Sequence, residues 1–265
     1  MIYKYRSFES KYRYDIFTNS EVYFAKPSEF NDPFESKPQL VGLETLKKRQ
    51  DYVENYIKRK FDHLKYIEKR NLKKELLIRF VNSNSVAKDI HKVLNEYGIF
   101  SAAEKWDQAL MWSHYSNSHK GFCVGFEFEK EFDFEMGMAL EVKYKTNYPN
   151  LSPEIFIENT IENNEKILEA TLATKSKEWS YENEIRYIKL ARDGGNGVYE
   201  FSSSNVKEVI FGACITKDNK DELIRIVKKH MPWVNFYQSR TSKSKYELYR
   251  EPLKLTNSSS GTTNP

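Results

Sequence analysis

The run LETLKKRQDYVENYIKRKFDHLKYIEKRNLKKELLIRFVNSNSVAKDIHKVLN, residues 43–95, decides the fold class of this chain. It contains no proline and no glycine, the two residues that most disfavour a helix interior. Its apolar residues recur at spacings that one buried helix face produces, namely Leu43, Leu46, Tyr52, Tyr56, Phe61, Leu64, Ile67 and Leu72. The run therefore predicts two or three helices.

Outside this run, most of the regular segments are short and strand-like. Strands are predicted at residues 2–6, 21–25, 98–102, 122–128, 140–144, 184–190, 198–201, 206–211, 234–238 and 246–249. Further helices are predicted at residues 8–17, 107–117, 153–174 and 217–230. Helices grouped in one block, with strands clustered elsewhere, indicate the α+β class rather than alternating βαβ units.

We therefore predict a single sheet-based α+β domain over residues 1–255. Residues 43–95 would form a helical insertion into this domain, or a lid on it. Residues 256–265 contain only Asn, Ser, Gly, Thr and Pro, so they are predicted to be a disordered tail.

The composition places limits on the class of protein. Only 39% of the 265 residues are hydrophobic, but 15% are aromatic, and Tyr and Phe each bury a large area in a core. Cys123 and Cys214 lie far apart without CxxC spacing, as in a reduced intracellular protein. No run approaches the roughly 18 apolar residues of a membrane span, and the N-terminus has no signal-peptide core. We expect a soluble cytoplasmic protein without membrane contact, of undetermined oligomeric state.

Positive charge is concentrated in residues 44–79, which hold twelve Lys/Arg and six Asp/Glu. This balance of +6 exceeds the net charge of +4 for the whole chain, so the remainder carries −2. A basic helical segment of this kind can contact nucleic acid phosphates. A solvated helix surface has the same composition, and both interpretations stay open.

Residues 110–126 combine indole, phenol, imidazole, hydroxyl and ammonium groups ahead of a predicted strand. The density of such side chains from Trp112 to Tyr115 indicates the wall of a binding pocket. On the strand itself Gly121, Cys123 and Gly125 form a small face, which lets a helix, a second backbone or a ligand ring approach closely.

The chain lacks the recognised motifs for metal or phosphate binding. His114, His119 and Cys123 lack the spacing of a zinc motif, so no metal site is predicted. The chain contains no P-loop and no GxSxG nucleophile motif.

Glu182, Glu184 and Arg186 would share one face if strand alternation ran through all three residues. The two carboxylates would then lie roughly 7 Å apart. Each would raise the pKa of the other in a poorly solvated setting, while Arg186 would keep one of them ionised. This arrangement suits the stabilisation of a developing positive charge. An exposed charged face on an edge strand is the alternative.

Basic residues also lie on the first predicted strand, where Lys4 and Arg6 flank Tyr5. A basic residue that protrudes from a core strand suggests an anionic partner, either a phosphate or an internal carboxylate. A turn-rich loop with two prolines follows the second strand, and Asn31 and Asp32 lie at its centre.

Four landmarks, taken together, resemble a bacterial family without settled function, domain-of-unknown-function family 2971. They are residues 3–7 (Tyr-Lys-Tyr-Arg-Ser), 24–35 (from Phe-Ala-Lys-Pro to Asn-Asp-Pro-Phe-Glu), 111–126 (from Met-Trp-Ser-His-Tyr-Ser to Gly-Phe-Cys-Val-Gly-Phe) and 179–186 (Trp, then Tyr-Glu-Asn-Glu-Ile-Arg). They occur in the family's order and cover residues 1–211.

The order of a basic first-strand residue, a Ser/Tyr-rich motif and a late Glu-x-Glu is also similar to that of ADP-ribosyltransferases. This resemblance implies that Arg6, or alternatively Lys4, holds the phosphate or ribose of NAD. Ser113 or Tyr115 would support the nicotinamide ribose. Glu184 would stabilise the oxocarbenium-like transition state, and Glu182 would orient the acceptor.

The resemblance therefore implies an NAD-dependent effector that modifies a nucleic acid or protein acceptor, as a toxin or phage-defence component. The implied catalytic residues are Glu184, Glu182, Tyr115, Ser113 and His114. The implied cofactor contacts are Lys4, Tyr5, Arg6, Asn31, Asp32, Trp112, Gly121 and Arg186, with Trp112 and Tyr115 stacking on the nicotinamide. The alternative function is a non-catalytic module that binds nucleic acid or a nucleotide.

Overall fold

A computed structural model describes residues 1–41, 44–81, 92–129, 132–133, 135–152, 155 and 160–254. The predicted tail at 256–265 lies outside the described residues. The α+β prediction is confirmed, because helices occur together with a mixed sheet. No helix in the described ranges is long and apolar enough to cross a membrane.

The chain divides into two compact units, each assembled from segments that are distant in sequence. Unit 1 comprises Met1–Glu21, Ala102–Phe128 and Glu200–Pro265, and unit 2 comprises Val22–Ser101 and Glu129–Tyr199. The organisation as one domain over residues 1–255 stays a prediction.

Unit 1 contains five strands in the spatial order β15-β14-β13-β5-β1. Their bounds are β1 (Ile2–Arg6), β5 (Phe122–Phe126), β13 (Val206–Phe211), β14 (Asn235–Thr241) and β15 (Leu248–Pro252). β13 and β14 are parallel, and the other neighbours are antiparallel. β5 lies between β13 and β1 with every residue buried, which explains why its sequence lacks polar side chains.

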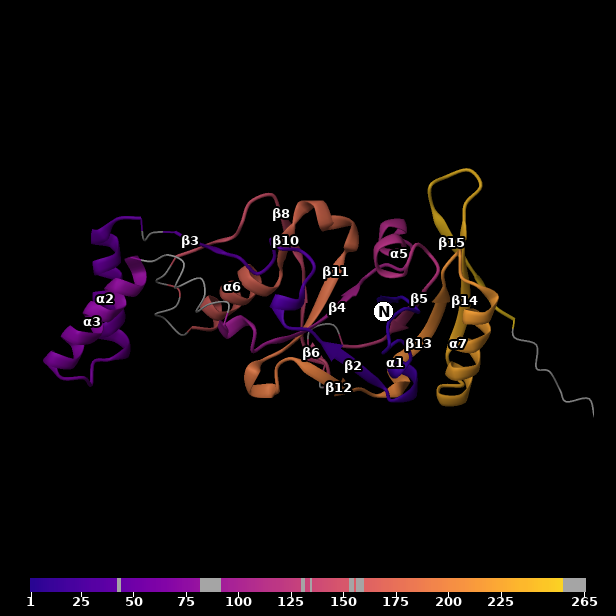
Figure 1. Cartoon of the computed structure of the whole chain (residues 1–265), viewed down its shortest axis with the longest axis horizontal. Helices are drawn as coiled ribbons and strands as arrows, with labels where there is room; N and C mark the ends of the chain where they lie inside the picture. Colours follow the sequence, from indigo (N-terminus) through magenta and orange to yellow (C-terminus); the bar gives the residue numbers. More distant parts are fainter. Residues whose placement is uncertain are drawn as a thin grey trace, which may run out of the picture. The chain divides into compact units, whose positions relative to one another are not determined.

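The helices of unit 1 are α1 (Asp15–Thr18), α5 (Ala109–Tyr115) and α7 (Lys217–His230). The prediction of α7 is confirmed at both ends, because Thr216 caps its first turn and Leu223 and Val227 bury its apolar face. α7 packs against α1 (Figure 1).

The predicted helix at residues 8–17 is wrong except for its last three residues. Ser10 bonds the backbone of Tyr12 and Arg13, and these local bonds compete with a helix.

Unit 2 contains the strand order β4-β11-β7-β6 and three small two-stranded sheets, β10-β8, β12-β2 and β3-β9. The bounds are β2 (Glu21–Phe24), β3 (Gln39–Leu40), β4 (Gly98–Ala103), β6 (Phe132–Asp133), β7 (Gly137–Glu141), β8 (Lys143–Lys145), β9 (Asn150–Leu151), β10 (Thr174–Ser176), β11 (Glu184–Lys189) and β12 (Gly197–Glu200). The last two residues of β4 belong to unit 1.

The predicted helical block gives α2 (Leu46–Lys60) and α3 (Tyr66–Val81), which pack side by side (Figure 1). They have a small core of their own around Tyr52, Val53 and Ile57. The helix predicted at 153–174 is shorter in the described residues, because α6 (Ile161–Leu172) follows a Thr160 cap and Thr174 begins β10. Its predicted start at Pro153 lies outside the described residues.

Candidate functional site

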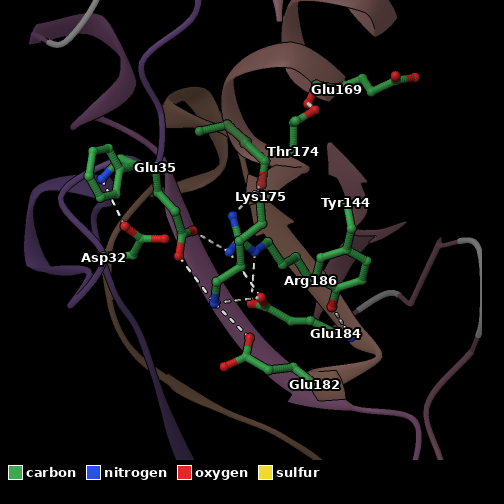
Figure 2. Close-up of polar contacts among 11 residues, drawn as sticks. Asp32, Glu35, Tyr144, Glu169, Thr174, Lys175, Glu182, Glu184 and Arg186 are labelled. Carbon is green, nitrogen blue, oxygen red and sulfur yellow. Dashed lines mark hydrogen bonds and ion pairs between the residues drawn. The ribbon is translucent and has the colours of Figure 1, made fainter. Parts of the chain in front are cut away.

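Five charged side chains of unit 2 meet in its interior and form a buried ion-pair network (Figure 2). Lys175 of β10 lies at its centre, because its Nζ contacts three carboxylates. The distances are 2.6 Å to Glu182, 3.1 Å to Glu35 and 3.4 Å to Glu184. All four of these residues are buried, so the ammonium group exchanges its water shell for carboxylate oxygens.

The fifth member, Arg186, binds Glu184 in a bidentate manner. Its Nε donates to one oxygen of Glu184 at 2.8 Å, and its Nη2 donates to the other at 3.0 Å. Nη2 also pairs with Glu35, and Nη1 donates to the carbonyl of Leu172 at 2.7 Å. The Phe30 ring lies 5.0 Å from the guanidinium carbon. All three nitrogens of the Arg186 guanidinium therefore donate hydrogen bonds inside the protein.

Local backbone geometry determines how the two glutamates reach the network. Glu182 ends the 3₁₀ helix η3 (Lys177–Glu182), and Asn183 then adopts a left-handed conformation with φ 44°. Strand alternation therefore does not extend from Glu184 back to Glu182, although both contact Lys175. The edge-strand alternative is wrong, because β11 lies between β4 and β7 and its charged residues are buried.

The charges within the network determine the ionisation of its members. Burial by itself raises the pKa of the Glu184 carboxyl, but the positive charges of Arg186 and Lys175 outweigh it and lower that pKa. Burial likewise acts to lower the pKa of Lys175, and the charge of Glu184 is the largest of the opposing effects that raise it. Glu184 is thus an ionised carboxylate whose two oxygens are already bound.

Two members of the network, Glu35 and Lys175, were not among the site residues predicted from the sequence. Glu35 closes the landmark loop that contains Asn31 and Asp32, and this position was a usable signal. The sequence indicated Lys175 only indirectly. Two buried glutamates need two positive partners, and Arg186 supplies only one of them.

The two loop residues that were predicted as cofactor contacts differ in their surroundings. Asn31 is exposed, whereas Asp32 is buried and its Oδ1 accepts the backbone N–H of Phe34 at 2.9 Å. This Asx-type turn fixes the loop that carries Glu35 into the network. The visible role of Asp32 is therefore to shape the loop.

A pocket of about 290 Å³ borders the network in unit 2. Three segments supply its lining, namely Phe34, Ser36 and Lys37 from the first, Lys145–Pro149 from the second and Thr174–Ser176 from the third, together with Ala170 of α6. Lys37, Lys145 and Lys175 all line it, and none of the lining residues that the structure describes is Asp or Glu. We call this cavity the lysine pocket.

In unit 1, Trp112 is a core residue. Its ring is fully buried and its Nε1 donates to the Trp106 carbonyl at 2.7 Å. The Tyr5 ring meets it edge-on at 5.2 Å, and the His119 ring stacks on it at 6.2 Å. These neighbours leave no open face of Trp112 for a nicotinamide.

Three predicted catalytic residues on α5 are accessible or partly so. Ser113 and His114 are exposed, and Tyr115 is half-buried. The Ser113 hydroxyl donates to the Ala109 carbonyl at 3.1 Å and lies 3.4 Å from Nε2 of His119. It is therefore already engaged within its own helix turn.

The predicted first-strand residues lie close to the same helix in unit 1. Tyr5 donates its hydroxyl to the Lys105 carbonyl at 2.9 Å, and Lys4 is half-buried. Burial lowers the pKa of Arg6, whose Nε has no hydrogen-bond partner among the described residues. A Cβ on Gly121 would lie 2.0 Å from the Arg6 carbonyl, so this glycine is required by close backbone packing.

The predicted residues thus gather in two groups. Arg6 and Tyr115 belong to unit 1, and Glu184 belongs to unit 2. A single cleft that joins all three residues stays a prediction.

The fold and the network define an α+β protein with a buried ion-pair network beside a cationic pocket. The family model of a protein of unknown function, DUF2971, matches residues 111–187, which confirms the predicted family relationship over that segment. The matched residues include the landmarks around Trp112 and Glu184, whereas those around Arg6 and Glu35 lie outside them. No curated protein and no solved structure matches the chain.

Proposed function

We propose that this protein is a non-catalytic binding module whose ligand carries a phosphate group and occupies the lysine pocket of unit 2. The composition of the lining carries the proposal, since three lysines and no acidic residue line the cavity within the part of the chain that the structure describes. A cationic cavity attracts anions, and lysine is a common point-charge ligand for phosphate.

The charges around the pocket leave positive charge available to a ligand. Lys175 is neutralised by the network, but Lys37 has the carbonyl of Pro33 as its one acceptor among the described residues. Lys145 lies 3.5 Å from Glu169, which also pairs with Lys143. Two ammonium groups share that one carboxylate. An anion that binds Lys145 therefore breaks only a weak ion pair, because Glu169 keeps its contact with Lys143.

The geometry of Glu184 favours this proposal over ADP-ribosyl transfer. A transferase needs a carboxylate that can face the positive charge developing on the ribose. Both oxygens of Glu184 are instead bound by Arg186, and Lys175 approaches one of them as well. In the proposed function the network is a scaffold that holds Lys175 and the Glu35 loop beside the pocket. The NAD cofactor and the role in toxin or defence systems stay predictions that rest on the resemblance.

Thermal denaturation of the full chain with inorganic phosphate, pyrophosphate and 5′-AMP tests the proposal. A ligand at 100 times its dissociation constant adds about 2.7 kcal/mol to the free energy of unfolding, which raises the melting temperature. The double variant Lys37→Ala/Lys145→Ala should lose this rise, while Lys217→Ala on α7 of unit 1 should keep it. Sodium chloride at matched ionic strength separates binding from screening. No rise with any of the three ligands, or an equal rise in the double variant, would overturn the proposal.

A further inference from the structure

We infer that the ligand of the lysine pocket is a nucleoside monophosphate, with its phosphate at Ser36, Lys37 and Lys145 and its base against Phe34 and Tyr148. The inference rests on the proposed function and names the class of phosphate-bearing ligand. It rests on two features of the same cavity, a buried polar residue at one position and exposed aromatic side chains at another.

Ser36 marks the polar position. It is only 4% exposed, yet its hydroxyl has no hydrogen-bond partner among the described residues. Leaving a buried hydroxyl unpaired destabilises a fold, so such a group needs a specific reason. Ser36 lines the lysine pocket beside Lys37 and has a left-handed backbone with φ 57°. The hydroxyl oxygen has less than 1 Å² accessible to solvent, so a phosphate oxygen would bond it only after the Ser36 side chain turns toward the cavity, where Lys37 supplies positive charge.

Strand pairing fixes the backbone of the segments that carry or follow the lysines around this position. β8 and β10 are parallel, and Lys145 pairs with Ser176 in their register. β3 and β9 are also parallel, and the backbone N–H of Gln39 donates to the Pro149 carbonyl at 2.8 Å. The segments before β3 and before β9 are therefore tied to each other, and residues of both line the cavity. Such a preformed site loses little entropy when a small ligand binds.

Phe34 and Tyr148 mark the aromatic position. The side chain of Phe34 is 61% exposed and that of Tyr148 is 38% exposed, and both line the pocket. Large exposed aromatic side chains at a cavity are suited to stacking on a planar ring, and a nucleobase presents a π-face for this contact. A simple sugar phosphate would leave these rings in water.

The volume of the pocket limits the size of the ligand. About 290 Å³ lies at the small end of the range of roughly 300–1,000 Å³ for small-molecule sites. One base, one ribose and one phosphate suit such a volume, whereas a dinucleotide such as NAD carries twice those groups.

Isothermal titration of the full chain with the four common ribonucleoside 5′-monophosphates, ribose 5-phosphate and NAD tests the inference. At least one monophosphate should bind about tenfold or more tightly than ribose 5-phosphate, because stacking on an aromatic ring is lost without a base. Phe34→Ala should remove this preference and leave ribose 5-phosphate binding unchanged. Tyr148→Ala provides an independent second variant. Tyr12→Ala in unit 1 is the matched control, because Tyr12 is 57% exposed and lies outside the pocket.

Two results would overturn the inference and leave the proposed function intact. In one, ribose 5-phosphate binds as tightly as every monophosphate, or the preference survives in both Phe34→Ala and Tyr148→Ala. In the other, NAD binds more tightly than every monophosphate. Failure of every phosphate-bearing ligand to bind would instead overturn the proposed function, and the inference with it.

Discussion

Arg186 donates to both carboxylate oxygens of Glu184, its neighbour two positions earlier on β11, at 2.8 and 3.0 Å. The two side chains therefore point to the same face of the strand and neutralise each other inside unit 2. Lys175 reaches the same carboxylate from β10 and Glu35 reaches the same guanidinium from a loop, so three segments converge there. Glu184 is consequently a structural anion in this arrangement.

Replacing Glu184 by Gln should strongly destabilise the protein. The amide keeps the shape of the side chain but leaves Arg186 and Lys175 with less buried negative charge. Removing one partner of a buried pair costs about 3–5 kcal/mol, which urea denaturation would measure. Glu169→Gln, at an exposed ion pair, is the control and should cost no more than about 1 kcal/mol. Wild-type stability combined with loss of NAD consumption would instead support the transferase prediction.

The pH dependence of stability should carry the signature of Glu184. Its pKa is lowered in the folded state from the ordinary value of 4.5. Its stabilisation is therefore complete above pH 4.5 and is lost as the pH falls through the lower, folded-state pKa. The difference in unfolding free energy between wild type and Glu184→Gln should be constant from pH 7 to about 5 and shrink at lower pH. A difference that grows on acidification would contradict the assignment.

Ser36→Ala should raise stability and weaken ligand binding together. An unpaired buried hydroxyl costs about 1–3 kcal/mol, and its removal relieves part of that cost. The matched control is Ser116→Ala in unit 1, because the buried Ser116 hydroxyl donates to the Trp112 carbonyl at 2.7 Å. That variant should lose about 1 kcal/mol. Thermal melts with and without 5′-AMP measure both effects, and a destabilised Ser36→Ala would show that its hydroxyl has an internal partner.

Trp112→Ala should unfold much of unit 1 rather than remove a ligand contact. Truncating a fully buried tryptophan costs about 3–5 kcal/mol. Trp233→Ala in the same unit should cost less, because half of that side chain is exposed. A melting temperature near wild type for Trp112→Ala would show that the ring has a role other than packing.

The sequence-based prediction of secondary structure succeeded where an element is determined by residues close to it in the sequence. Residues 206–211 and 217–230 form β13 and α7 with the predicted ends, since a short apolar run and a Thr216 cap act within a few residues. Residues 8–14 failed as a helix because Ser10 offers the backbone competing local bonds. The helical character predicted for residues 43–95 is confirmed in α2 and α3, which have their own small core.

The candidate site was predictable only in part. Glu182, Glu184 and Arg186 were identified from their spacing, but strand alternation from Glu182 was wrong, because the left-handed Asn183 interrupts it. Glu35 and Lys175 were missed because the residues that they contact in the network lie far from them in the sequence. Nothing in the local sequence indicated the lysine pocket, whose lining comes from three separated segments.

By itself, the sequence determined the α+β class, most strand and helix positions, and the relationship to the DUF2971 family over residues 111–187. Only the tertiary structure decided that Glu184 is neutralised, that Trp112 is buried, and that Lys37 and Lys145 face one cavity. The physical reason is the range of the interactions. Hydrophobic periodicity and capping act over one or two helix turns. The ionisation and exposure of a side chain instead depend on the groups that folding brings against it, such as Glu35, which reaches Arg186 across 151 positions.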